Sequence, residues 1–396
     1  MENAPNATKP ERLLSLDALR GANMFFLIGG ATFFMKLASF WPCEWTKAIA
    51  SQMDHVPWEG FTQHDMIFPL FLFMAGVAFP FSLAKQLNTG RTSWQIHRKI
   101  ILRALAFVLL GFLYNNSVRF NFSELRFPSV LGTIGVGWMI AALVFMHSKT
   151  AVRVLYCVVV LLAYWFTVAL VPAPDTAPPD AFTKEAWLDR GTHLLNPNEN
   201  ILRNFTPDGN ILGYVDRTCI PGRLLMTTFD GAAEIIFTAS VTAMLGMFCG
   251  AFIRRREQYS PYCQVGLLLL SGTLLILLGL LWNQVFPINK PLWTSSYVCL
   301  AGGISIVALA LFYLVIDVLK FKRWTFFFVV IGVNSIAAYM IRPLFGLYQT
   351  NEFFFRGFAD FFTDKATQEL VMAGGYIAVT WGVLYFLYRN KIFFKV

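Results

Sequence analysis

The chain has 396 residues, of which 56% are hydrophobic and only 14% are charged, and its mean hydropathy is +0.55. Soluble domains average about 45–50% apolar and about 25% charged residues, so this composition excludes a soluble globular protein, a disordered chain and a disulfide-rich secreted domain. The net charge is +9, but no polar segment of the sequence contains a basic run with interleaved aromatics, so nucleic acid is not an expected partner. The sequence predicts a polytopic membrane protein in contact with the lipid bilayer.

Ten segments are apolar over the roughly 20 residues that a helix needs to cross a bilayer. They cover 16–36, 65–87, 98–115, 127–147, 151–171, 231–252, 263–282, 295–318, 325–347 and 368–389. We therefore expect an all-α bundle of about ten transmembrane helices, which forms a single domain over 1–396. Lys and Arg concentrate in alternate short loops, which predicts that both termini are cytoplasmic. The two long loops, 37–64 and 172–230, are then periplasmic if the membrane is a bacterial inner membrane.

Ionisable side chains in or beside apolar spans are functional candidates. Asp17 and Arg20 share a helix face, which predicts an internal ion pair or, for Arg20, a phosphate contact. Asp230 and Glu234 share a face where the sixth span begins, and they would either orient a cationic or sugar substrate or satisfy the helix N-terminus. Asn334 belongs to a polar stripe of the ninth span, which must face the bundle or a cavity.

The first long loop contains a candidate catalytic residue, His55. Histidine is the side chain best suited to proton transfer near neutral pH, although a surface histidine in a loop needs no such role. Pro57, Trp58 and Gly60 follow it and predict a folded turn. Asp65 opens the second span, where it would also serve as a helix cap.

The cysteines predict no metal site, because the six of them show no metal-binding spacing. Cys43 and Cys219 both belong to the predicted periplasmic loops, where a disulfide between them is an open possibility.

Several segments, taken in order, resemble the heparan-alpha-glucosaminide N-acetyltransferase family, which includes a lysosomal transmembrane enzyme and bacterial relatives. The likeness is most specific in the blocks HVPWEGFT (55–62), DMIFP (65–69) and NKPLWTSSYV (289–298). It is weaker in SLDALRG (15–21), because other membrane acyltransferases begin in a similar way. Further matching segments are FLFMAG (71–76), RFPSVL (126–131), GYVDR (213–217) and the pair Asn334–Ser335.

The resemblance implies that acetyl-CoA, used as a co-substrate from the cytosolic side, acetylates an amino sugar on the other side. The catalytic histidine of the family maps to His55, which we expect to act as a general base or as an acetyl carrier. The resemblance also maps the aspartate that opens the next helix to Asp65, an electrostatic partner of His55 or a substrate ligand.

The remaining candidates are residues expected near the CoA or near the amino sugar. The phosphates of CoA are expected near the basic cytoplasmic side, at Arg20 with Asp17, Lys99 and Arg103, although positive-inside topology alone also accounts for such residues. Around the sugar or glucosamine-bearing oligosaccharide we expect Trp58, Asp230, Glu234, Asn289, Lys290 and Asn334. Related proteins suggest a homodimer, and no metal is expected.

Two other functions remain open from the sequence. An inner-membrane transporter of amino sugars would use the same buried polar residues as a permeation path. An enzyme that O-acylates a cell-surface glycan would share the fold and most of the chemistry.

Overall fold

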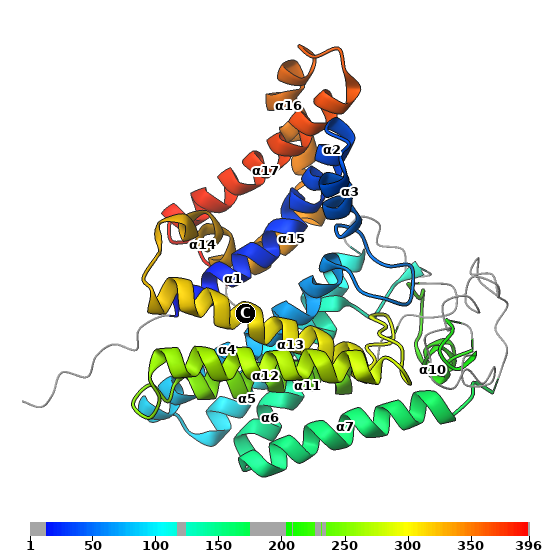
Figure 1. Ribbon diagram of the computed structural model, residues 1–396, viewed down its shortest axis with the longest axis vertical. Coiled ribbons are helices and arrows are strands. Elements are labelled where there is room, and N and C mark those ends of the chain that lie inside the picture. The colour runs from blue at the N-terminus through cyan, green and yellow to red at the C-terminus, as the bar shows by residue number, and fades with distance from the viewer. Residues whose placement is uncertain are drawn as a thin grey trace, which may run out of the picture.

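A computed structural model describes residues 13–116, 124–174, 203–207, 209–225, 231 and 235–394, except for the side chains of 342–345. Within these ranges the chain is helical, with isolated β-bridges but no β-strand. The all-α class expected from the sequence is confirmed. Figure 1 shows the helices gathered into two groups, one containing α4–α7 and α11–α13 and the other containing α1–α3 and α14–α17.

The first half of the chain forms α1 (Leu14–Phe25), the π-helix η1 (Phe26–Gly30), α2 (Ala31–Phe40), α3 (Glu44–Ser51), the 3-10 helix η2 (Gln63–Met66), α4 (Ile67–Asn88), α5 (Ser93–Asn116), α6 (Val130–His147) and α7 (Thr150–Leu170). The second half forms α10 (Ile211–Cys219), α11 (Ile235–Ile253), α12 (Pro261–Trp282), α13 (Ser295–Phe312), the π-helix η5 (Tyr313–Val318), the 3-10 helix η6 (Arg323–Thr325), α14 (Phe326–Val333), α15 (Ser335–Phe345), α16 (Leu347–Ala359) and α17 (Lys365–Arg389).

The described residues include eight helices that are long and apolar enough to cross a membrane, or nine if the bent pair Arg323–Val333 and Ser335–Ile341 is one span. Multi-pass architecture is confirmed, with fewer such helices than the ten expected. The remaining segment, 98–115, does form a helix of 24 residues, α5, but it is not among those spans. Arg98, Lys99 and Arg103 lie in its first half, and such charges oppose burial in hydrocarbon.

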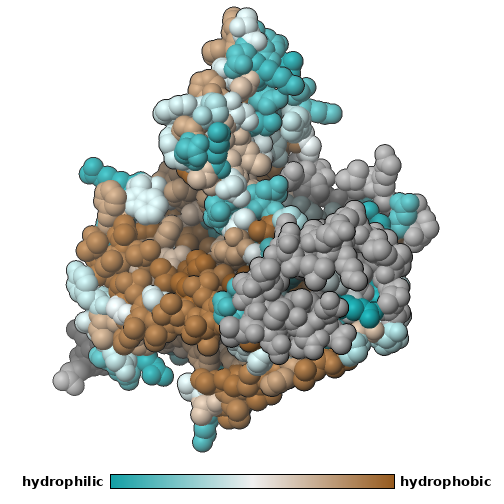
Figure 2. Space-filling model, turned by 45° about the vertical axis from the view of Figure 1, so that its right-hand side comes forward, coloured by the Kyte–Doolittle hydropathy of each residue, from teal (hydrophilic) through white to brown (hydrophobic). Residues whose placement is uncertain are grey.

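The apolar surface of the bundle agrees with a lipid environment. Figure 2 shows broad hydrophobic areas on the face in view. Exposed leucines also follow α12, among them Leu270, Leu274 and Leu281. A water-soluble monomer rarely exposes apolar patches of this extent.

Small residues bring α4 and α11 into close contact. A β-carbon on Gly246 would lie 2.0 Å from the backbone oxygen of Phe73, and one on Gly76 would lie 2.1 Å from that of Ala243. Membrane helices commonly pack through such residues, because lipid provides no hydrophobic force between helices. This contact fixes the position of α4 against α11. Because α4 begins two residues after Asp65, the contact also helps to position that residue.

One predicted span is broken. α14 and α15 meet at an angle of 64°, and Asn334 lies between them with non-helical dihedral angles. Its side-chain amide donates to the carbonyl of Ile392 at 3.0 Å and accepts from the backbone N–H of Phe394 at 3.2 Å. The polar residue within this apolar segment therefore binds the C-terminal part of the chain.

Candidate functional site

The candidate site lies where two loops from distant parts of the chain meet. One loop, 52–62, connects α3 to η2, and the other, 283–294, connects α12 to α13. The backbone N–H of Gly60 donates to the carbonyl of Ile288 at 2.9 Å, and Glu59 and Asn289 form an antiparallel bridge. These bonds bring Lys290 next to His55, which lies 235 positions earlier in the chain.

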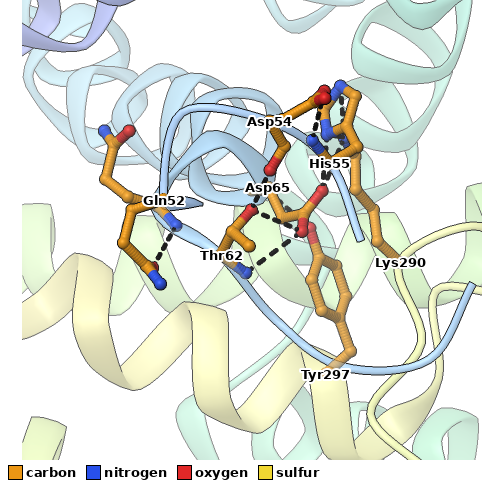
Figure 3. A network of polar contacts seen from close by, with 8 residues as sticks. Gln52, Asp54, His55, Thr62, Asp65, Lys290 and Tyr297 are labelled. Atoms are coloured by element: carbon orange, nitrogen blue, oxygen red, sulfur yellow. Dashed lines mark hydrogen bonds and ion pairs between the residues drawn. The ribbon is translucent and has the colours of Figure 1, made fainter. Parts of the chain in front are cut away.

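His55, Asp65 and Lys290 form the polar centre of the site (Figure 3). Nδ1 of His55 lies 2.6 Å from Oδ1 of Asp65, and Nζ of Lys290 lies 3.2 Å from the same oxygen. A carboxylate only accepts hydrogen bonds, so the short contact assigns the imidazole proton to Nδ1. The lone pair of the ring is then on Nε2, the atom that can take a proton or attack a carbonyl carbon.

Asp65 is fixed from several sides at once. It is the third residue of η2 and forms a capping box with Thr62, whose backbone N–H donates to Oδ2 of Asp65 at 3.1 Å. The hydroxyl of Thr62 lies 3.0 Å from the same oxygen, and the hydroxyl of Tyr297 donates to the backbone carbonyl of Asp65 at 2.8 Å. Only 1% of the Asp65 side chain is exposed, against 50% for His55. The carboxylate is therefore a buried support and the imidazole is open to a substrate.

Burial lowers the pKa of Lys290 below its ordinary value of 10.5, and the carboxylate of Asp65 offsets part of this shift. Lys290 is 21% exposed, and its Nζ lies 3.1 Å from Nδ1 of His55. A cation in this position stabilises the ionised form of Asp65.

A cavity of about 210 Å³, partly open to solvent, begins at this centre and extends between the two groups of helices. His55, His64 and Lys290 line its mouth, and the rest of its lining comes from α1, η1, α4, α5, α6 and α15. Tyr114 of α5 and Tyr339 of α15 both line it, and their rings stack with centroids 4.6 Å apart. The site is thus a polar mouth on a mainly apolar cavity, a common form of ligand site.

Arg20 and Arg103 form a second, separate polar group. Arg20 pairs with Asp17 at 3.4 Å, so the expected ion pair is present. The guanidinium of Arg103 lies over the ring of Trp138, 4.5 Å from its centroid, and is close enough to Arg20 for the two to repel each other. The buried Nε of Arg103 has no hydrogen-bond partner among the described residues. Two neighbouring guanidiniums of this kind suit an anionic ligand.

Helix geometry relates this group to the cavity. Arg20 lies one turn of α1 before Met24, which lines the cavity. Arg103 lies on the same face of α5 as Tyr114, about 16 Å away along the helix axis. The arginines therefore lie along the same helix faces as the cavity lining, toward the start of α1 and α5 and away from His55.

Three predicted substrate residues are held by hydrogen bonds within the fold. Trp58 is fully buried, and its indole N–H donates to the carbonyl of Phe205 at 2.8 Å. Asn289 is 1% exposed and its side chain accepts from the backbone N–H of Leu292 at 2.8 Å. Asn334 binds the C-terminal segment and does not line the cavity.

The other predicted residues are less informative. Lys99 is exposed on α5, one turn before Arg103. Asp230 and Glu234 lie outside the described residues. Cys43 and Cys219 are both free, so the disulfide that the sequence left open is absent.

Sequence reasoning missed Thr62, His64 and Tyr297 as parts of the site. Thr62 belongs to the specific block 55–62 and Tyr297 to the specific block 289–298, so their positions carried a signal. His64 lies just before Asp65 and outside these blocks, and its only signal is that it is the second histidine in the same loop.

Comparison with known families gives one match, over residues 12–124, to a domain of unknown function, DUF5009. This region contains α1 to α5 and therefore both His55 and Asp65. The match covers under a third of the chain and does not indicate an activity.

Two curated relatives are similar over most of the chain. Heparan-alpha-glucosaminide N-acetyltransferase from Homo sapiens is 23% identical over 442 aligned positions, which cover 98% of this chain and 60% of the human protein. The protein of the same name from Mus musculus is 24% identical over 400 positions, covering 86% of this chain and 56% of its own length. The chain thus spans a little over half the length of these relatives.

Proposed function

We propose that the chain is a member of the heparan-alpha-glucosaminide N-acetyltransferase family, to two of whose proteins it is similar over most of its length. We propose further that it transfers an acetyl group from acetyl-CoA to the amino group of a glucosamine-type sugar or oligosaccharide. The observation that carries the proposal is the half-exposed imidazole of His55, held by buried Asp65 at the mouth of a cavity. An amine acceptor would approach this imidazole from solvent, and the thioester would reach it through the cavity.

The arrangement suits acyl transfer chemistry. Asp65 holds the proton of His55 on Nδ1 and stabilises the positive charge that the ring gains during reaction. Nε2 is then available either to take a proton from the attacking amine or to accept the acetyl group itself. Lys290 lies next to both residues. There it would contact either the carbonyl oxygen, on which negative charge develops, or the bound sugar.

The described residues also fit a CoA thioester. The cavity lies between the imidazole and the face of α5 that carries Arg103, and the unpartnered guanidinium N–H of Arg103 supplies a donor for an anion. Arg20 and Arg103 would hold the phosphates, and Lys99 would add a positive charge at the surface. The thioester itself supplies the activated acetyl group.

The proposed location is the inner membrane of a bacterium, with acetyl-CoA on the cytoplasmic side and the sugar in the periplasm. Support for a membrane location comes from the eight or nine potential spans among the described helices. Support for the sidedness comes from the Lys and Arg of the short loops.

The test uses the full chain, purified in nanodiscs, with labelled acetyl-CoA and glucosamine. We expect wild type to form base-stable N-acetylglucosamine, and we expect His55→Ala to lose at least about 100-fold in rate, the usual contribution of a general base. His97→Gln, which removes an imidazole on α5 that contacts His147 instead, should retain the wild-type rate.

Other outcomes would contradict the proposal. Glucosamine uptake into proteoliposomes without acetyl-CoA, and unaffected by His55→Ala, would identify a transporter. A base-labile product would identify an O-acyltransferase.

A further inference from the structure

A second imidazole, that of His64, faces the first. The rings of His55 and His64 meet edge to face with centroids 4.5 Å apart. His64 lines the same cavity, and its buried Nδ1 has no hydrogen-bond partner among the described residues. Buried polar atoms are normally paired, so an unpaired ring nitrogen beside a reactive imidazole needs an explanation.

An acetyl group carried on His55 would create a need for a second base. In the first half-reaction, Nε2 of His55 bonds to the thioester carbonyl carbon, the C–S bond breaks and CoA leaves as a thiolate. In the second, the amine nitrogen bonds to that carbon, the bond to Nε2 breaks, and its electron pair returns to the ring. The amine nitrogen must then lose a proton, but Nε2 is occupied until the acetyl group leaves.

The neighbouring groups are poor acceptors for this proton. Asp65 is buried and already accepts from His55, Lys290 and Thr62. Nδ1 of His55 carries a proton in its bond to Asp65, and Lys290 is the cation of the ion pair. Of the described residues at the mouth of the cavity, His64 is the remaining group with an unused ring nitrogen.

We propose that His64 is a second catalytic base, which accepts the proton of the amine as it attacks an acetyl group carried on His55. The inference rests on the acetyltransferase function proposed above. After transfer, the proton passes from His64 to the CoA thiolate or to water, so that amide and free thiol are the net products. The charged or titratable groups that act on His64 are His55, Lys290, Asp65 and Asp54. Burial, a protonated His55 and Lys290 disfavour the protonated form of His64, so that the ring rests as a neutral base, and the two carboxylates partly offset this once the proton has been taken up.

The experiment separates the two half-reactions in the full chain. CoA release is followed with a thiol reagent after acetyl-CoA is added alone, and transfer of label is then followed after glucosamine is added. We expect His64→Gln to keep a burst of one CoA per site at a rate within about twofold of wild type. We expect its transfer to glucosamine to fall about 100-fold, the range for loss of a general base.

Two further variants guard against a structural effect. Gln63→Ala changes the neighbouring residue of the same short helix without removing an imidazole, and it should behave like wild type in both steps. Added imidazole should restore part of the transfer step in His64→Ala, because a diffusing base can occupy the space that the side chain leaves. Rescue by imidazole would not be seen if His64 served only to support the fold.

Three results would overturn the inference. These are transfer by His64→Gln within about threefold of wild type, equal loss of the burst and the transfer without rescue by imidazole, and a wild type that releases CoA only when the amine is present. Failure of wild type to acetylate any amino sugar would instead refute the proposed function, so the two proposals fail in different ways.

Discussion

Asp65 caps a helix and contacts His55 at the same time. Its carboxylate completes the capping box of η2 through one oxygen and holds His55 and Lys290 through the other. The cap fixes the direction of the carboxylate, so the imidazole is oriented by a group that cannot easily rotate. A helix cap at this position is therefore also a means of orienting His55.

The pKa of Lys290 predicts how acetyl transfer depends on pH. Below that pKa the ammonium pairs with Asp65, and as the pH rises through it the amine becomes neutral and the pair is lost. Because burial lowers this pKa, kcat/KM should fall on the alkaline side at a pH below the 10.5 of an ordinary lysine. Lys290→Arg keeps its charge to higher pH, so the alkaline fall should move upward in a pH–rate profile.

A lysine elsewhere in the chain supplies the control for this prediction. Lys36 pairs with Glu369 at 2.8 Å on the surface, and Lys36→Met should leave both the rate and its pH profile unchanged. An alkaline limb that is identical in wild type and Lys290→Arg would show that another group titrates.

At the scale of elements, the site depends on how closely α4 approaches α11. Gly246→Ala should lower the unfolding temperature in detergent, because its β-carbon would lie 2.0 Å from a backbone oxygen. Forced overpacking of this kind costs about 1–3 kcal/mol. Acetyl transfer should fall as well, since α4 begins only two residues after Asp65.

Gly266 of α12 is the matched control for Gly246. A β-carbon there meets no atom within 4 Å, so Gly266→Ala should leave the unfolding temperature unchanged. Equal unfolding temperatures for the two variants would contradict a role for the close contact between α4 and α11.

The elements themselves were largely predictable. Each of the ten apolar segments coincides with helix, within a few residues at most ends, because hydropathy over about 20 residues is a local property. The break at Asn334 and the short helices α3, α10 and α16 were not predicted. Short helices depend on tertiary contacts for their stability, and those contacts leave little trace in a local pattern.

At the scale of the whole molecule, the cavity lies between a histidine site and a pair of arginines. An imidazole lies at its mouth, and the guanidiniums of Arg20 and Arg103 lie further along the helices that line it. Acyl transfer across a membrane requires such a separation if the donor and the acceptor come from opposite sides.

This separation predicts that Arg103 affects one substrate only. Arg103→Gln should raise the KM for acetyl-CoA about tenfold through loss of a charged contact and leave the KM for glucosamine unchanged. Arg98→Gln alters an exposed arginine of the same helix and should change neither. Steady-state kinetics with each substrate varied in turn checks this, and a change in the KM for glucosamine would place Arg103 at the other end of the site.

The sequence by itself determined the all-α membrane class, the positions of the apolar helices and the candidates His55 and Asp65. These follow from composition, from runs of apolar residues and from short blocks, all of which are properties of neighbouring residues. The tertiary structure alone decided that Lys290 contacts His55, that His64 faces it, and which backbone groups bind the side chains of Trp58, Asn289 and Asn334. The physical reason is that these contacts join loops and helices distant in the chain, and packing in three dimensions determines which of them meet.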